Sequence, residues 1–156
     1  MTMNPTNPVV ALCAAGMECE GTPDEARALF ERAWDARCDD YDASIAAHFL
    51  ARLQPTPADT LRWNEVALRH AQAVPDGRAV DLMASLLLNV GDSYFAVGQY
   101  TAAATAAERA AECVVGLPAD GYRELVERGI RRLQQRLRDD GCAGGYDSSG
   151  RAEAGA

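Results

Sequence analysis

The stretch LNVGDSYFAVGQYTAAATAAERA, residues 88–110, decides the fold. Small residues stand at positions 91, 103 and 110 and tyrosines at 94 and 100, so side chains suited to packing recur at helical spacing. Gly98 interrupts this run, and a glycine between two periodic segments commonly ends a helix because it adopts a positive φ without a Cβ clash. The stretch therefore predicts two helices joined at Gly98 and packed closely as a hairpin.

Composition favours a single helical domain. The chain has 156 residues, of which 48% are hydrophobic and 6% aromatic, and this is enough to bury one core. Alanine is abundant, β-branched runs are nearly absent, and the alternation typical of strands is missing. The net charge of −8 argues against a general affinity for nucleic acid or for an anionic membrane.

The N-terminal segment and the cysteines predict a cytoplasmic protein with no cofactor or metal. No basic residue precedes the short apolar stretch in MTMNPTNPVVALCAAGM, residues 1–17, so a secretory signal is not expected. No segment approaches the ~20 apolar residues that span a bilayer. The five cysteines are odd in number and lack CxxC spacing, which argues against a disulfide framework or a zinc site.

A repeat relates successive parts of the chain. TPDE (22–25) and TPAD (56–59) are 34 residues apart, and each has a threonine suited to capping, a proline for the first turn and an acid near the positive helix end. Ala33 and Ala67 follow these threonines by eleven residues, and Ala110 closes a third unit after an insertion at 75–83. A period of 34 residues with a helix–turn–helix in each unit predicts a solenoid.

The third unit resembles the tetratricopeptide repeat (TPR) family. The matching positions are Leu87, Val90, Gly91, Tyr94, Gly98, Tyr100, Ala103 and Ala110. The chain departs from the family at Ala107, where a phenylalanine is usual, and in the second unit, where QPTP (54–57) replaces the glycine turn. The resemblance spans residues 7–118 and implies an all-α, right-handed superhelical solenoid of antiparallel helix hairpins with a C-terminal capping helix.

We therefore predict seven helices, at about residues 8–19, 23–38, 40–53, 57–73, 78–97, 100–115 and 119–138. One TPR-like domain is expected over residues 1–139, with repeats at about 7–40, 41–74 and 84–117 and the capping helix at 119–138. The apolar stripe of that last helix consists of Tyr122, Leu125, Val126, Ile130, Leu133 and Leu137. Residues 140–156 are rich in glycine, serine and alanine, and predict a disordered tail.

The sequence leaves a catalytic function open as an alternative. Asp39, Asp40, Asp42 and His48 together could bind a divalent ion, and they are the candidate cluster for a helical enzyme or enzyme subunit. The first two aspartates lie at a predicted helix start, however, where acids stabilise the positive end of the helix dipole. No Ser–His–Asp arrangement, HExxH motif or phosphate-binding glycine loop is present. We therefore prefer a non-catalytic function, with a self-associating scaffold or homo-oligomer as a further alternative.

The TPR resemblance places a binding groove on the first helix of each hairpin. In helices 40–53 and 78–97, the groove candidates outside the packing stripes are Tyr41, Ser44, His48, Arg52, Ser85, Asn89, Asp92 and Phe95. Asn89 stands where peptide-binding members carry an asparagine that holds ligand backbone or carboxylate, but the lysines that bind chaperone tails have no counterpart here. The expected function is an adaptor that binds a protein or peptide partner. Internal pairing of His48 and Arg52 with Asp92 is the alternative.

Overall fold

Seven α-helices account for most of the chain in the computed structural model, which describes residues 4–19 and 21–141. The helices are α1 (Pro8–Glu18), α2 (Pro23–Asp35), α3 (Asp40–Ala51), α4 (Pro57–Ala73), α5 (Val80–Ala96), α6 (Tyr100–Val114) and α7 (Gly121–Gly141). All seven predicted helices are confirmed, and their ends differ from the prediction by at most three residues. Within the described ranges no residue lies in a strand, so the fold is all-α.

The helix ends follow the capping chemistry of the sequence, with one exception. Thr56 accepts a hydrogen bond from the Asp59 amide at 3.1 Å, and Gly98, which follows α5, has a φ of 77°, as expected. The predicted cap at Thr22 is wrong. Its hydroxyl instead bonds the Cys19 carbonyl at 3.1 Å and the Glu25 carboxylate at 2.8 Å.

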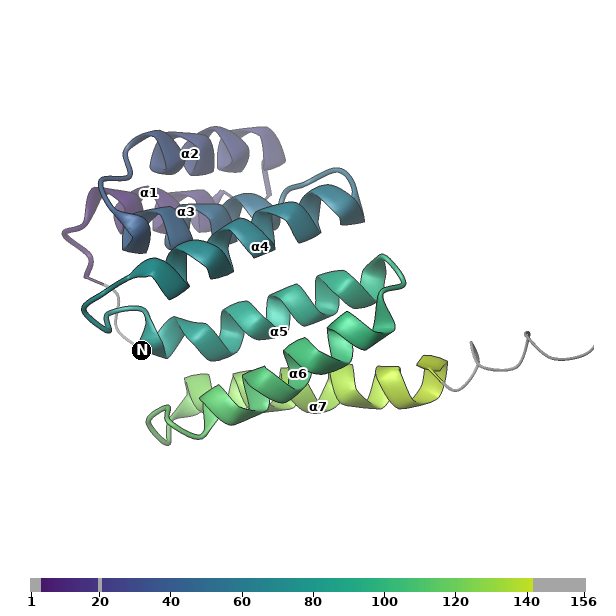
Figure 1. The fold of residues 1–156 in the computed structure, drawn as a ribbon. Helices are drawn as coiled ribbons and strands as arrows, with labels where there is room; N and C mark the ends of the chain where they lie inside the picture. Colours follow the sequence, from purple (N-terminus) through teal and green to yellow (C-terminus); the bar gives the residue numbers. More distant parts are fainter. Residues whose placement is uncertain (1–3, 20, 142–156) are drawn as a thin grey trace, which may run out of the picture.

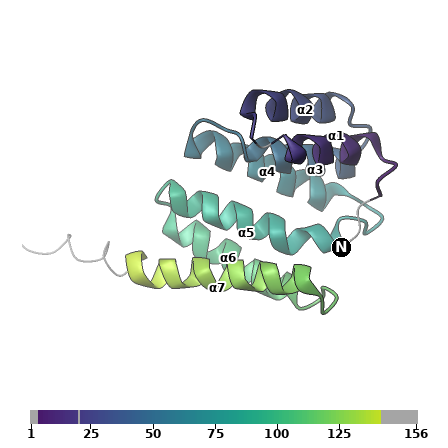
Figure 2. The ribbon, with the colours of Figure 1, turned by 180° about the vertical axis from the view of Figure 1, so that it is seen from behind.

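Packing occurs mostly between helices that are neighbours in the sequence. The pairs α1–α2, α3–α4 and α5–α6 pack closely and succeed one another through the molecule, with α7 at the end (Figure 1). Among the odd-numbered helices, α1 lies against α3 and α5 lies against α7, which Figure 2 shows from behind. The backbones of α3 and α5 do not approach each other closely, and these two helices are joined mainly through α4.

Small residues allow the hairpin of α5 and α6 to pack as the opening stretch predicted. A Cβ atom at Gly91 would lie 2.8 Å from Leu133 Cδ2 and 3.4 Å from the Ala103 carbonyl oxygen. Ala103 and Ala110 are completely buried, and so is Leu133 of α7. Gly91 is therefore enclosed by α6 on one side and by α7 on the other.

The last helix differs from its prediction in two respects. Val126, Ile130 and Leu133 are buried as the apolar stripe requires, but Leu125 is 58% exposed, so its assignment to the buried stripe is wrong. The helix also continues to Gly141, into the segment expected as a tail, whose remaining residues 142–156 lie outside the described part of the chain. Within the described part, no helix combines the length and apolarity needed to cross a membrane.

Candidate functional site

Two adjoining pockets lie between α3 and α5, where the two backbones stay apart. The pocket on the α4 side has a volume of about 480 Å³, and the pocket on the α7 side has a volume of about 390 Å³. Both are lined by His48, Asn89 and Asp92. Six of the eight predicted groove residues line one or both pockets: Ser44, His48, Arg52, Ser85, Asn89 and Asp92.

His48 and Asn89 form the partition that the two pockets share. His48 Nδ1 lies 3.2 Å from Asn89 Nδ2, and the ring packs edge-on against Phe49 with centroids 5.0 Å apart. Burial, aided by the charge of Arg52, lowers the pKa of His48 to about 4. The ring is therefore neutral at pH 7, and its Nδ1 atom accepts a hydrogen bond from the Asn89 amide when Nε2 carries the proton.

Asp92 pairs with a residue from α7 that was not among the predicted groove residues. Arg136 Nη1 lies 2.9 Å from Asp92 Oδ1, and the Arg136 guanidinium stacks 4.0 Å above the centre of the Phe95 ring. Burial raises the pKa of Asp92, while Arg136 and Arg132 act in the opposite direction. Phe95 lines neither pocket, and its contacts with Arg136 and Tyr100 place it beside them.

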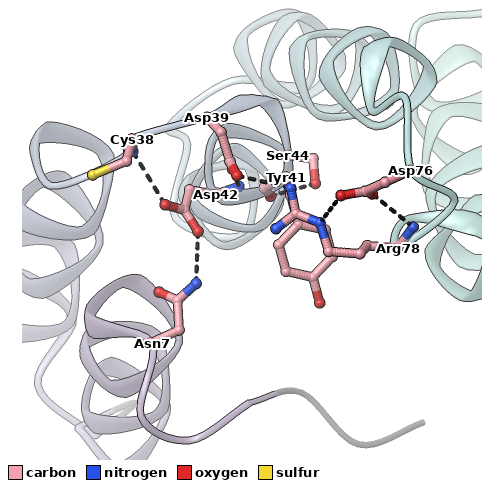
Figure 3. Close-up of polar contacts among 8 residues, drawn as sticks. All are labelled: Asn7, Cys38, Asp39, Tyr41, Asp42, Ser44, Asp76 and Arg78. Carbon is pink, nitrogen blue, oxygen red and sulfur yellow. Dashed lines mark hydrogen bonds and ion pairs between the residues drawn. The ribbon is translucent and has the colours of Figure 1, made fainter.

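Tyr41 also lies outside both pockets, at the start of α3. The Arg78 guanidinium lies 4.9 Å from the centre of its ring, and Arg78 pairs with Asp39 at 2.8 Å and with Asp76 at 2.6 Å (Figure 3). Ser44, one turn further along α3, is completely buried and donates its hydroxyl hydrogen to the Tyr41 carbonyl at 2.8 Å. Tyr41 therefore belongs to a polar junction between α3 and the loop before α5.

The aspartates of the alternative metal cluster each have a separate structural contact. Asp39 caps α3 by accepting a bond from the Asp42 amide, and this bond and Arg78 lower its pKa. Asp42 accepts bonds from Asn7 Nδ2 at 2.7 Å and from the Cys38 amide at 3.1 Å (Figure 3). Asp40 lies 2.7 Å from His70 Nδ1. Within residues 4–19 and 21–141, no group of three or more His, Cys, Asp or Glu side chains could hold a metal ion.

The sequence analysis missed the wall that α7 contributes to the α7-side pocket. Its members are Tyr122, Leu125, Val126, Gly129 and Arg132. The Tyr122 hydroxyl donates to Ser85 Oγ at 2.8 Å, and a Cβ atom at Gly129 would lie only 2.5 Å from Leu88 Cδ2. Positions 122, 125, 129, 132 and 136 recur every three or four residues, so their spacing could have revealed this face.

A buried polar pair that lines the α4-side pocket had no such signal in the sequence. Asn64 of α4 donates to Ser93 Oγ of α5 at 2.8 Å, and both residues are buried. The Ser93 hydroxyl in turn donates to the Asn89 carbonyl at 2.8 Å, which links α4 to the partition.

Comparison of the chain with protein-family models, curated proteins and solved structures gave no match.

Proposed function

We propose that the chain is a TPR-like adaptor, a non-catalytic right-handed solenoid that binds a peptide segment of a partner protein in the groove between α3, α5 and α7. The 34-residue repeat and the sequential helix hairpins support this assignment. The observation that carries the proposal is the pair of adjoining pockets with a common partition at His48 and Asn89.

The pockets suit an extended chain better than a compact ligand. They lie side by side, so successive side chains of one segment can reach both, and the partition offers amide and imidazole groups for backbone hydrogen bonds. Arg52 lines the α4-side pocket and Arg132 lines the α7-side pocket, and each provides a charged donor. The α7-side pocket combines apolar side chains with polar groups, as is typical of binding pockets.

The groove is specific to one position in the helix stack. The backbones of α1 and α3 pack closely, as do those of α5 and α7, whereas the backbones of α3 and α5 stay apart in the described part of the chain and the two pockets lie between them. This junction coincides with the predicted insertion at 75–83, of which the residues from Val80 onward belong to α5. A partner segment would fill the space that a neighbouring helix fills elsewhere.

Selection from a random peptide library tests the proposal. Peptides selected on the wild-type chain are measured by fluorescence polarisation against two variants. Ala96→Trp adds an indole at an exposed residue of the α4-side pocket, and Ala73→Trp adds the same group at an exposed residue of α4 that lines neither pocket. We expect Ala96→Trp to weaken binding by about tenfold or more, as loss of one well-filled contact does, and Ala73→Trp to bind normally.

Two results would contradict the groove as the binding surface. One is a selection that enriches no peptide above a selection without protein. The other is a set of peptides that bind both variants as they bind the wild type. Sedimentation equilibrium at several protein concentrations tests the self-association alternative in parallel.

A further inference from the structure

The groove has a local charge opposite to that of the chain. The net charge of the chain is −8, but the ionised residues that line the two pockets at pH 7 are Arg52, Arg132 and Asp92. Asp92 is already matched by Arg136 at 2.9 Å. Arg132 therefore gives the α7-side pocket a positive charge on an otherwise acidic protein, and this favours a ligand with a carboxylate.

Arg132 is the cation of the α7-side pocket. Its side chain is exposed, and no hydrogen bond or ion pair joins it to another residue in the part of the chain that the structure describes. An exposed arginine whose guanidinium N–H groups make no hydrogen bond to the protein can bind a carboxylate through two parallel hydrogen bonds.

Beside these polar residues, the pocket has an apolar wall. Phe49 of α3, Leu86 and Leu88 of α5, and Val126 of α7 line it, and Leu125 beside them is 58% exposed. The volume of about 390 Å³ falls within the roughly 300–1,000 Å³ of typical ligand pockets. An apolar side chain that enters here would also cover Leu125, which α7 leaves in water.

We infer that the α7-side pocket takes one large apolar side chain of the partner segment, and that Arg132 binds the carboxylate of an aspartate or glutamate next to it in that segment. The inference rests on the proposed function and specifies its ligand. An internal acid is preferred to a chain terminus, because a segment that also reaches the α4-side pocket continues past Arg132.

Blocked tetrapeptides test both halves of this recognition. The probe is Gly-Trp-Asp-Gly with an acetylated N-terminus and an amidated C-terminus, titrated into the full chain labelled with ¹⁵N. Its first control replaces the aspartate by asparagine, which keeps the shape and removes the charge, and its second replaces the tryptophan by glycine. We expect amide shifts centred on residues 122–132, about fivefold weaker binding for the asparagine peptide, and loss of the shifts for the glycine peptide.

A matched pair of protein variants assigns the charge effect to one arginine. Arg132→Gln should bind the aspartate and asparagine peptides equally. Arg128→Gln makes the same change one turn earlier on α7, at an exposed residue that lines neither pocket, and should keep the preference for aspartate. Neither substitution reaches the core, so thermal melting should match the wild type in both.

Three results would overturn the inference. They are equal binding of the aspartate and asparagine peptides to the wild type, shifts that map away from α7, and tighter binding of a peptide that ends in a free tryptophan carboxylate. If Ala96→Trp still weakens the binding of library peptides under any of these results, the proposed adaptor function is retained and only the inferred ligand chemistry is rejected. If the library also yields no binder, the adaptor function fails as well.

Discussion

His48 Nδ1 lies 3.2 Å from Asn89 Nδ2, across the space that separates α3 from α5. This contact spans the two helices where their backbones stay apart, and it divides that space into two pockets. Because burial keeps the imidazole neutral, the partition carries no charge at pH 7, and the arginines and Asp92 supply the charge of the groove.

The first prediction follows from the lowered pKa of His48. The pKa of this ring is about 4 in the folded chain against an ordinary value of 6.5, so between these pH values the unfolded chain binds the additional proton. The contribution of His48 to stability is therefore intact above pH 6.5 and falls as the pH drops toward 4, by about 3 kcal/mol at full effect. Urea unfolding at several pH values measures this dependence.

His48→Gln provides the control for that dependence. Glutamine keeps an amide near Asn89 but does not titrate, so the difference in unfolding free energy between wild type and variant should shrink as the pH falls from 6.5 to 4. Carboxylates that titrate in both proteins cancel in this difference. A difference that stays constant over this range would show that His48 is not held neutral in the fold.

The second prediction concerns the close approach at Gly91. A Cβ atom here would lie 2.8 Å from Cδ2 of the completely buried Leu133 and 3.4 Å from the Ala103 carbonyl oxygen. Gly91→Leu should therefore cost about 1–3 kcal/mol of unfolding free energy through overpacking. Gly121→Leu is the control, because no atom lies within 4 Å of a Cβ atom at the start of α7. Equal stability of the two variants would contradict the packing of α5 against α6 and α7.

The third prediction concerns Asp42, which joins α1 to α3. Its buried carboxylate accepts bonds from Asn7 at 2.7 Å and from the Cys38 amide at 3.1 Å. Asp42→Ala leaves both donors without this acceptor and should cost about 1–3 kcal/mol. Asp76→Ala removes an exposed carboxylate from Arg78 and should change stability much less than Asp42→Ala does. Chemical denaturation measures both, and faster hydrogen exchange at the Cys38 amide should accompany only the first.

The helices could be predicted from the sequence because their signals are local. Proline in the first turn at Pro23 and Pro57, positive φ at Gly98 and apolar residues at helical spacing depend on a few neighbouring residues, and the structure has the helices they predict. The exception at Thr22 is also local, since Glu25 competes for its hydroxyl. Such competition is not visible in a capping pattern.

The site could be predicted only in part, because it depends on which helices face each other. The spacing on α3 and α5 identified His48, Asn89 and Asp92, but not that Asp92 pairs with Arg136 on α7. The sequence analysis described α7 only as a capping helix with an apolar stripe. It did not anticipate that Gly129 lets this helix approach Leu88 closely enough for Arg132 and Arg136 to reach the groove.

The last prediction separates binding from folding at the groove. Arg52 is exposed and lines the α4-side pocket, so Arg52→Ala should weaken the capture of selected peptides by about 1–3 kcal/mol and change stability by less than about 0.5 kcal/mol. Asn89→Ala should weaken capture by a similar amount, but it also removes the bond to His48 and should cost about 1 kcal/mol of stability. Arg69→Ala, at an exposed arginine of α4 that lines neither pocket, is the matched control for both measurements.

The two readouts together decide what these side chains do. Fluorescence polarisation measures capture, and urea unfolding measures stability, on the same preparations. If Arg52→Ala and Asn89→Ala both unfold more easily while selected peptides bind them normally, the residues of the partition form an internal polar network. The binding surface would then have to lie outside the space between α3 and α5. If peptide binding weakens for both variants and the unfolding free energy falls only for Asn89→Ala, then Asn89 contributes to stability and to ligand binding. Arg52 then contributes to ligand binding alone.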